Sequence, residues 1–167
     1  MTRYETLTLL TCASRLAQGF SYRTRPAIEL SEWLERHPLG FEWDPDTGRF
    51  RSNQISREDW NTLRDKLARE IGRMRKARPD AMARNCADLA RYLGLNRVEA
   101  DIFMLSARAA QGGPLAALID NLVDDARLPV DQAIACLTAH PATTIRKAMG
   151  ARGKLMTSGL ISRLRTH

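Results

Sequence analysis

The chain has 167 residues, of which 44% are hydrophobic, 27% are charged and 6% are aromatic. This length can bury a hydrophobic core in one domain or in two small ones, and a core built mainly from Leu, Ile, Ala and Met favours helices over an all-β fold. The net charge is +7, from 26 Lys and Arg against 19 Asp and Glu, which brings acidic partners such as nucleic acid into consideration.

Apolar residues recur at helical spacing along the first half of the chain. They predict helices over residues 2–17, from Pro26 to His37, and from Ser56 to Arg78. Ser56, followed three residues later by Asp59, is typical of a capping box at the start of a helix. The period changes to alternation in residues 41–51, around the sequence Asp-Pro-Asp-Thr-Gly, which predicts a β-hairpin.

The second half predicts a series of shorter helices. They cover residues 81–93, the stretch from Asn96 to the Gly112-Gly113 pair, and the stretch from Pro114 through Leu122. Gly94 is expected to end the first of these helices in a left-handed conformation. Asn96 with Glu99 is expected to form a capping box at the start of the next.

The stretch from Gln132 to Ile161 reads as helix, tight turn, helix and apolar strand, which is typical of a winged helix-turn-helix. Its turn lies at His140-Pro141 and its strand at residues 159–161. In a DNA-binding winged helix, the second helix enters the major groove, and basic residues beyond it meet phosphates. The candidate contacts with nucleic acid or a protein partner are therefore Thr143, Thr144, Arg146, Lys147, Arg152 and Lys154. An ordinary solvated surface and a patch for an acidic protein remain alternatives.

No residue pattern argues for catalysis. Gly150 to Leu155 superficially resembles a phosphate-binding loop, but the first glycine is too close to Lys154, and Leu155 replaces the hydroxyl that would hold magnesium. A second group of residues, which is acidic, lacks the spacing and the glycine of a calcium-binding loop: Asp120, Asp124, Asp125 and Asp131. We therefore expect a chain that is not an enzyme, with no catalytic residue, no metal and no cofactor.

Cellular location is indicated by the cysteines and by the absence of targeting patterns. Cys12, Cys86 and Cys136 are far apart and odd in number, as expected for reduced thiols in a cytosolic protein. The N-terminal sequence does not have the pattern of a signal peptide, and no stretch approaches the roughly 18 apolar residues of a membrane span. The expectation is a cytoplasmic protein that does not contact a membrane.

Four short segments of this chain occur in an order that is also found in a known protein family. They are Leu93-Gly94-Leu95, Glu99 with Ile102, Ile145 to Ala148, and Leu155 to Ile161. Over about residues 81–161 they resemble the N-terminal, pre-ATPase region of a group of bacterial AAA+ ATPases. Residues 133–148 are also similar to bacterial winged-helix transcription factors. The AAA+ resemblance implies that an ATPase module follows His167, that the parent protein is an ATP-binding oligomer, and that this part recruits substrate, adaptor or nucleic acid. Walker motifs, sensor residues and an arginine finger are absent, so the resemblance assigns no catalytic residue.

The predicted fold class is mainly α, a helical bundle with one β-hairpin plus a C-terminal winged-helix-like domain. A domain boundary is expected at Pro79-Asp80, which divides the chain into residues 1–79 and 80–167. The leading functional hypothesis is a non-catalytic recruitment domain of a AAA+ ATPase. The alternative is a winged helix-turn-helix DNA-binding transcriptional regulator, and a structural scaffold is the third hypothesis.

Overall fold

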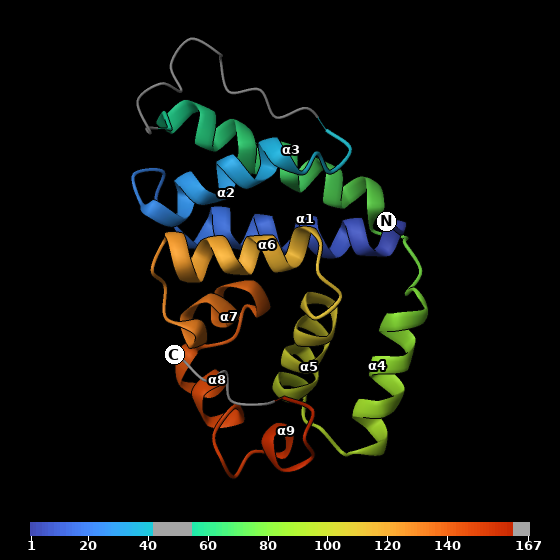
Figure 1. Cartoon of the computed structure of the whole chain (residues 1–167). Coiled ribbons are helices and arrows are strands. Elements are labelled where there is room, and N and C mark those ends of the chain that lie inside the picture. The colour runs from blue at the N-terminus through green and yellow to red at the C-terminus, as the bar shows by residue number, and fades with distance from the viewer. Residues whose placement is uncertain (42–54, 162–167) are drawn as a thin grey trace.

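The computed structural model describes residues 1–41 and 55–161. Within these two ranges the regular secondary structure is helical and contains no strand (Figure 1). The elements, in chain order, are α1 (Arg3–Gly19), α2 (Arg25–Arg36), α3 (Arg57–Met74), α4 (Ala81–Tyr92), α5 (Arg97–Ala109), α6 (Pro114–Asp120), the π-helical segment η2 (Asn121–Asp125), α7 (Val130–Thr138), α8 (Ala142–Ala148) and α9 (Lys154–Thr157).

Residues next to the helices determine several of the helix ends. Asn96 accepts a hydrogen bond from the Glu99 N–H while the Glu99 carboxylate accepts one from the Asn96 N–H, so the predicted capping box of α5 is confirmed. Gly94, just beyond α4, has the predicted left-handed conformation, with φ of 62°. Ser56 caps α3 as predicted, but its hydroxyl donates to the Asp59 carboxylate at 2.5 Å. The Asp59 side chain is one methylene shorter than the Glu that completes a full capping box, and it bonds to the Ser56 hydroxyl in place of the Ser56 N–H.

Helix α1 is the central helix of the molecule (Figure 1). It packs against α2 and α3 on one side and against α7 on the other. This environment explains why Leu9, Leu10 and Leu16 are almost completely buried and why even Thr6 and Ser14 lie in the interior. Both polar side chains are short and uncharged, so their burial costs much less than that of a charged group. Helix α1 can therefore be covered on both faces.

The hydrophobic core is continuous across Pro79. One cluster of buried side chains includes residues from α1, α2 and α3 together with residues from α5, α6, α7, α8 and α9. Trp33 of α2 is fully buried, and its indole Nε1 donates a hydrogen bond of 2.7 Å to the Pro114 carbonyl at the start of α6. Helices from both predicted domains therefore share one core. The domain boundary at Pro79-Asp80 stays a prediction.

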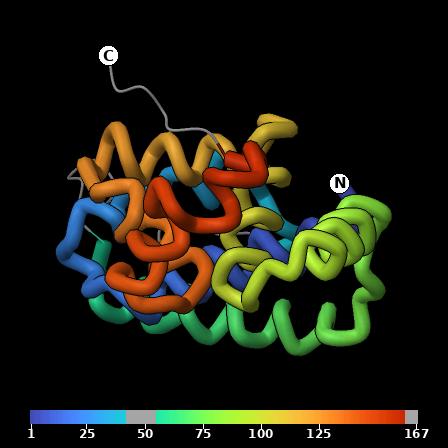
Figure 2. Tube along the Cα trace, turned by 90° about the horizontal axis from the view of Figure 1, so that it is seen from below, coloured from blue at the N-terminus to red at the C-terminus, as the bar shows by residue number. Residues whose placement is uncertain are grey.

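Helix α4 lies at the margin of the molecule in both views, beside α5 (Figure 1 and Figure 2). A polar network fixes its first turn. Asp80 caps α4 by accepting from the Ala83 N–H, and the same carboxylate receives Arg108 of α5 at 2.8 and 2.9 Å and the Thr2 hydroxyl at 3.0 Å. One carboxylate thus joins the ends of three helices.

The β part of the predicted fold class is wrong. Residues 42–51 of the predicted hairpin lie outside the described residues, and the remaining one, Phe41, lies in a bend. Where the wing was expected, residues 154–157 form α9, and the N–H groups of Leu160 and Ile161 both donate to the Leu155 carbonyl. A strand needs a neighbour to pair its backbone groups, and the described chain provides none, so this apolar triplet closes a turn instead. The helix-turn-helix therefore lacks the predicted strand.

In residues 1–41 and 55–161, no single helix is long and apolar enough to cross a membrane. Only α5 taken together with α6 and η2 meets the criterion, as a pair bent by 106°.

Candidate nucleic-acid interface

A groove of about 790 Å³ lies between the first turn of α5 and the segment from α8 to α9. One wall is formed by residues 96–99, and the other by residues of α8 and of the loop after it. Four of the six predicted contact residues line this groove: Thr144, Lys147, Arg152 and Lys154. The structure therefore brings most of the predicted set together, against a helix that the prediction did not include.

The remaining two predicted residues, Thr143 and Arg146, do not line the groove. Thr143 is exposed on α8. Arg146 is paired, because its Nε donates to Asp131 at the start of α7 at 2.6 Å. The hydrogen bond from Arg146 holds the pKa of the Asp131 carboxyl below its usual value. Arg146 thus connects the two helices of the helix-turn-helix, and its charge is largely neutralised.

Arg97 is a groove residue that the sequence analysis missed. It is the first residue of α5, directly after the Asn96 cap, and its side chain is exposed. The capping box had already located this helix start, but a basic first residue does not single it out, because Arg3, Arg25 and Arg57 also begin helices. The contribution of Arg97 becomes visible only where the fold brings α5 against α8 and α9.

The charge of the groove is strongly positive. Its lining contains four cations, Arg97, Lys147, Arg152 and Lys154, and one acid, Glu99. Glu99 is buried, and its carboxylate is occupied by the Asn96 N–H. Within the described ranges, the side chains of Arg97, Lys147 and Arg152 have no hydrogen-bond or ion-pair partner, while the Lys154 Nζ donates to the Gly94 carbonyl. Three cations in this groove are therefore free to bind an anion.

The loop after α8 holds Arg152 and Lys154 in place through close backbone packing. Gly153 lies so near the end of α8 that a Cβ atom there would be 2.2 Å from the Ala148 carbonyl oxygen. On the inner side, Ile145, Ala148 and Leu155 are buried in the core. Only glycine allows this approach, and the tight loop places the flanking cations on the groove wall.

An exposed aromatic side chain ends α4, two residues before Gly94. Tyr92, the last residue of α4, is 86% exposed, which is unusual for a large aromatic side chain. It precedes by two residues Gly94, whose carbonyl accepts the hydrogen bond from Lys154. The backbone that carries Tyr92 therefore leads directly to a residue that contacts the cationic wall of the groove.

Metal chemistry has no visible basis in this region. In the part of the chain that the structure describes, no group of three or more His, Cys, Asp or Glu side chains could hold a metal ion. Of the acidic residues that the sequence grouped together, Asp131 is paired with Arg146, and the other three belong to the end of α6 and to η2.

Comparison of the chain with protein-family models, with curated proteins and with solved structures gives no match. The AAA+ resemblance and the winged-helix resemblance therefore gain no support from relatives. The functional argument depends on the groove itself.

Proposed function

We propose that this chain binds single-stranded nucleic acid through its phosphate backbone, in the groove between α5 and the α8–α9 segment. The observation that carries the proposal is the convergence of Arg97, Lys147, Arg152 and Lys154 from three chain segments onto one groove with a single, occupied acid. Phosphate contacts from Lys and Arg supply most of the affinity of non-specific nucleic-acid binding. The net charge of +7 adds long-range attraction for a polyanion.

The first turn of α5 strengthens the anion-binding character of the groove. α5 has 13 residues, and its N-terminus carries the positive end of the helix dipole. Asn96 and Glu99 bond to one another, which leaves the N–H groups of Arg97 and Val98 on the groove wall without a partner in the described chain. Backbone N–H groups at a helix start are a common binding site for phosphate.

Single-stranded nucleic acid is favoured over sequence-specific duplex binding for two reasons. The second helix of the helix-turn-helix has only seven residues, and Arg146, its most suitable side chain for reading bases, is paired with Asp131. Tyr92, by contrast, offers an exposed ring on which an unpaired base can stack. Phosphate contacts fix position without reading sequence, so little sequence preference is expected.

Recruitment for a AAA+ ATPase module stays a prediction of the resemblance. If such a module follows His167, the groove proposed here is the part that would recruit nucleic acid to it. The binding activity proposed for this chain does not depend on that module.

The groove is tested by removing two of its charges. We expect the double substitution Lys147→Ala and Arg152→Ala to weaken binding of a fluorescently labelled single-stranded oligonucleotide at least tenfold, or about 1.4 kcal/mol, because two phosphate contacts are lost. Fluorescence anisotropy at low salt measures the affinity. Both side chains are exposed, so the fold is expected to remain intact, and circular dichroism checks this.

The matched control removes two positive charges from α3, which lies at the opposite end of the molecule from α8 and α9 (Figure 1). Arg64→Ala with Arg69→Ala gives the same net charge as the groove variant, and both arginines are exposed. A change of less than about twofold is expected for this control, since only the long-range field is altered. Equal weakening by both variants would show that net charge alone binds the oligonucleotide and would reject the groove.

A further inference from the structure

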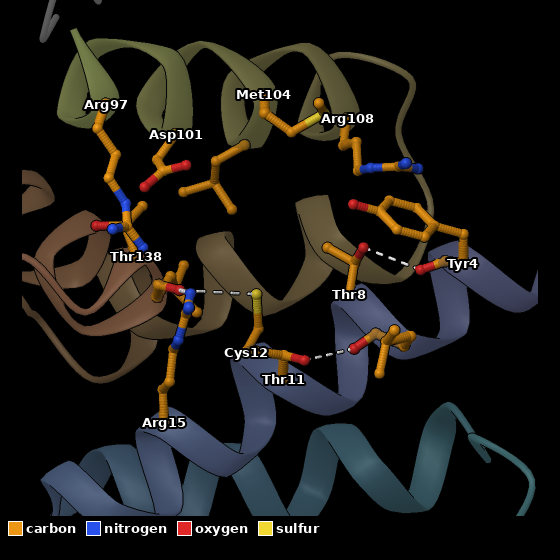
Figure 3. Close-up of a pocket in the computed structure, with 13 residues that line it drawn as sticks. Tyr4, Thr8, Thr11, Cys12, Arg15, Arg97, Asp101, Met104, Arg108 and Thr138 are labelled. Atoms are coloured by element: carbon orange, nitrogen blue, oxygen red, sulfur yellow. Dashed lines mark hydrogen bonds between the residues drawn. The ribbon is translucent and has the colours of Figure 1, made fainter. Parts of the chain in front are cut away.

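A second cavity, of about 290 Å³, lies between α1 and α5 (Figure 3). The two helices run in opposite directions, so that Arg15 of α1 and Arg97 of α5 share one end of the cavity, and Tyr4 and Arg108 share the other. Both helices pack against α7, which closes the cavity with Leu137 and Thr138. The volume is close to the lower limit for small-molecule sites.

One end of the cavity is cationic. In Figure 3, the side chains of Arg97 and Arg15 point into the same end of the cavity. Arg15 donates one hydrogen bond, from Nη1 to the Leu137 carbonyl at 2.6 Å, and its other N–H groups have no partner among the described residues. Two guanidinium groups with unused donors form a site for a planar oxyanion.

The opposite end contains a buried donor without a partner. Arg108 is only 6% exposed, and its Nη2 is paired with Asp80, but its Nε has no hydrogen-bond partner in the described chain. The guanidinium lies over the Tyr4 ring, 5.5 Å from its centroid. A buried unpaired N–H is costly, so a ligand that supplies an acceptor there would be stabilised.

Between the two ends, apolar and polar side chains both line the cavity. Leu7, Met104 and Leu105 line the middle, and the nearby hydroxyls of Thr8 and Thr11 already donate to carbonyls of α1. Burial raises the pKa of the Cys12 thiol to about 11, although Arg15 opposes this rise. The thiol therefore stays protonated at neutral pH, and the cavity has the character of a binding site, not of a nucleophilic site.

The charge balance selects the class of ligand. Arg15 and Arg97 supply two positive charges, and Asp101, which contacts His140 at 2.7 Å, supplies one negative charge. With His140 counted as neutral, one net positive charge is left to be neutralised at this end. Arg108 is already balanced by Asp80. A monoanion with an apolar body fits this arrangement better than a dianionic phosphate.

We propose that the cavity between α1 and α5 binds a small organic carboxylate. Its carboxylate lies between Arg15 and Arg97, its apolar body lies along Met104, and its far end presents a neutral hydrogen-bond acceptor to the Arg108 Nε. Arg97 lines both this cavity and the proposed nucleic-acid groove, so the two sites are neighbours that share one side chain. The proposal does not depend on nucleic-acid binding.

The test uses 3-(4-hydroxyphenyl)propionate as the probe, because its phenol oxygen can accept a hydrogen bond at the Arg108 end, and its neutral amide, 3-(4-hydroxyphenyl)propanamide, as an isosteric control. Titration into the ¹⁵N-labelled chain, followed by amide chemical shifts, is expected to give a Kd on the order of 1 mM for the carboxylate, as befits a fragment-sized ligand. The shifts should be largest in α1 and α5 around the cavity. The amide should bind at least about tenfold more weakly because it cannot pair with the guanidinium groups.

Variants locate the site. We expect Arg97→Gln and Arg15→Gln each to weaken binding of the carboxylate several-fold. Arg97 is exposed, so its replacement does not threaten folding. Arg152→Gln, in the nucleic-acid groove, should leave the Kd of the carboxylate unchanged. The proposal is overturned by an absence of saturable shifts up to about 10 mM, a concentration tenfold above the expected Kd. Equal affinity for the amide, or unchanged affinity in Arg97→Gln and Arg15→Gln, overturns it as well.

Discussion

At the scale of single residues, Asp80 makes the most connections of any carboxylate described above. Burial alone raises the pKa of Asp80, but hydrogen bonds from the Ala83 N–H, Arg108 and Thr2 outweigh that effect, and its pKa lies below the usual value. Its partner Arg108 is almost completely buried. Removing one member of such a pair leaves a buried charge uncompensated, which is more costly than losing an exposed ion pair.

Asp80→Asn tests this pair and keeps the helix cap, because Asn caps helices as well as Asp. We expect the free energy of unfolding at pH 7 to fall by about 3 kcal/mol, since Arg108 loses its counter-charge. A carboxyl with a lowered folded pKa stabilises the fold above its unfolded pKa of about 4 and loses this effect as pH falls through the folded value. Urea denaturation from pH 7 to pH 3 should therefore show the difference from wild type narrowing below about pH 4.

Asp88→Asn is the control for that experiment, because Asp88 pairs with Arg91 on the exposed face of α4. An exposed pair contributes little, so this variant should unfold almost as wild type does. Indistinguishable stability of Asp80→Asn and Asp88→Asn at pH 7 would contradict the role assigned to the buried pair.

At the scale of elements, the α8–α9 connection depends on Gly153. The φ of Gly153 is −69°, a value that any residue adopts, so the requirement for glycine comes from the neighbouring backbone. A Cβ atom would lie 2.2 Å from the Ala148 carbonyl oxygen and 3.1 Å from that of Gly150. Backbone atoms cannot move aside as a side-chain end can, and the loop that carries Arg152 and Lys154 would have to shift.

Gly153→Ala is therefore expected to destabilise the chain by about 1–3 kcal/mol, the usual cost of a forced backbone shift. It should also weaken oligonucleotide binding, although it removes no charge. Gly72→Ala in α3 serves as the control, because a Cβ atom there meets nothing within 4 Å and alanine favours a helix. Urea denaturation of both variants checks this, and a Gly153→Ala protein as stable as wild type would refute the close approach.

The sequence predicted those elements whose limits are local. Gly94, Asn96 with Glu99, and Ser56 act within a few residues of a helix end, and each is found at the end it predicted. The strand at 159–161 could not be judged locally, because a strand depends on a partner elsewhere in the chain. Leu160 packs against the core, but the apolar pattern did not reveal the backbone conformation in which it does so.

The candidate site was predictable to the extent that its residues are neighbours in sequence. Lys147, Arg152 and Lys154 lie within eight positions of one another and were found from their charge. The pairing of Arg146 with Asp131 joins residues 15 apart, and the contribution of Arg97 comes from a helix some 50 positions earlier. Periodicity contains no information about which distant helix faces which, so these contacts required the fold.

At the scale of the whole molecule, the shared core fixes the relation between the two halves of the chain. Central helix α1 packs against α3 before Pro79 and against α7 after it. The walls of the groove come from α5 and from the α8–α9 segment, both of which are anchored in the same core through Ile102, Ile145 and Leu155. The four cations are therefore held on a rigid framework, which favours binding because little ordering is required.

The most direct test of the central claim is a salt titration of single-stranded oligonucleotide binding by the wild-type chain. With four cations at the phosphates, the logarithm of the association constant should fall against the logarithm of salt concentration with a slope of about −3, and binding should be tighter than to a duplex of the same sequence. The slope should approach half that value in the Lys147→Ala, Arg152→Ala variant. A slope near zero, or an unchanged slope in that variant, would contradict binding in the groove.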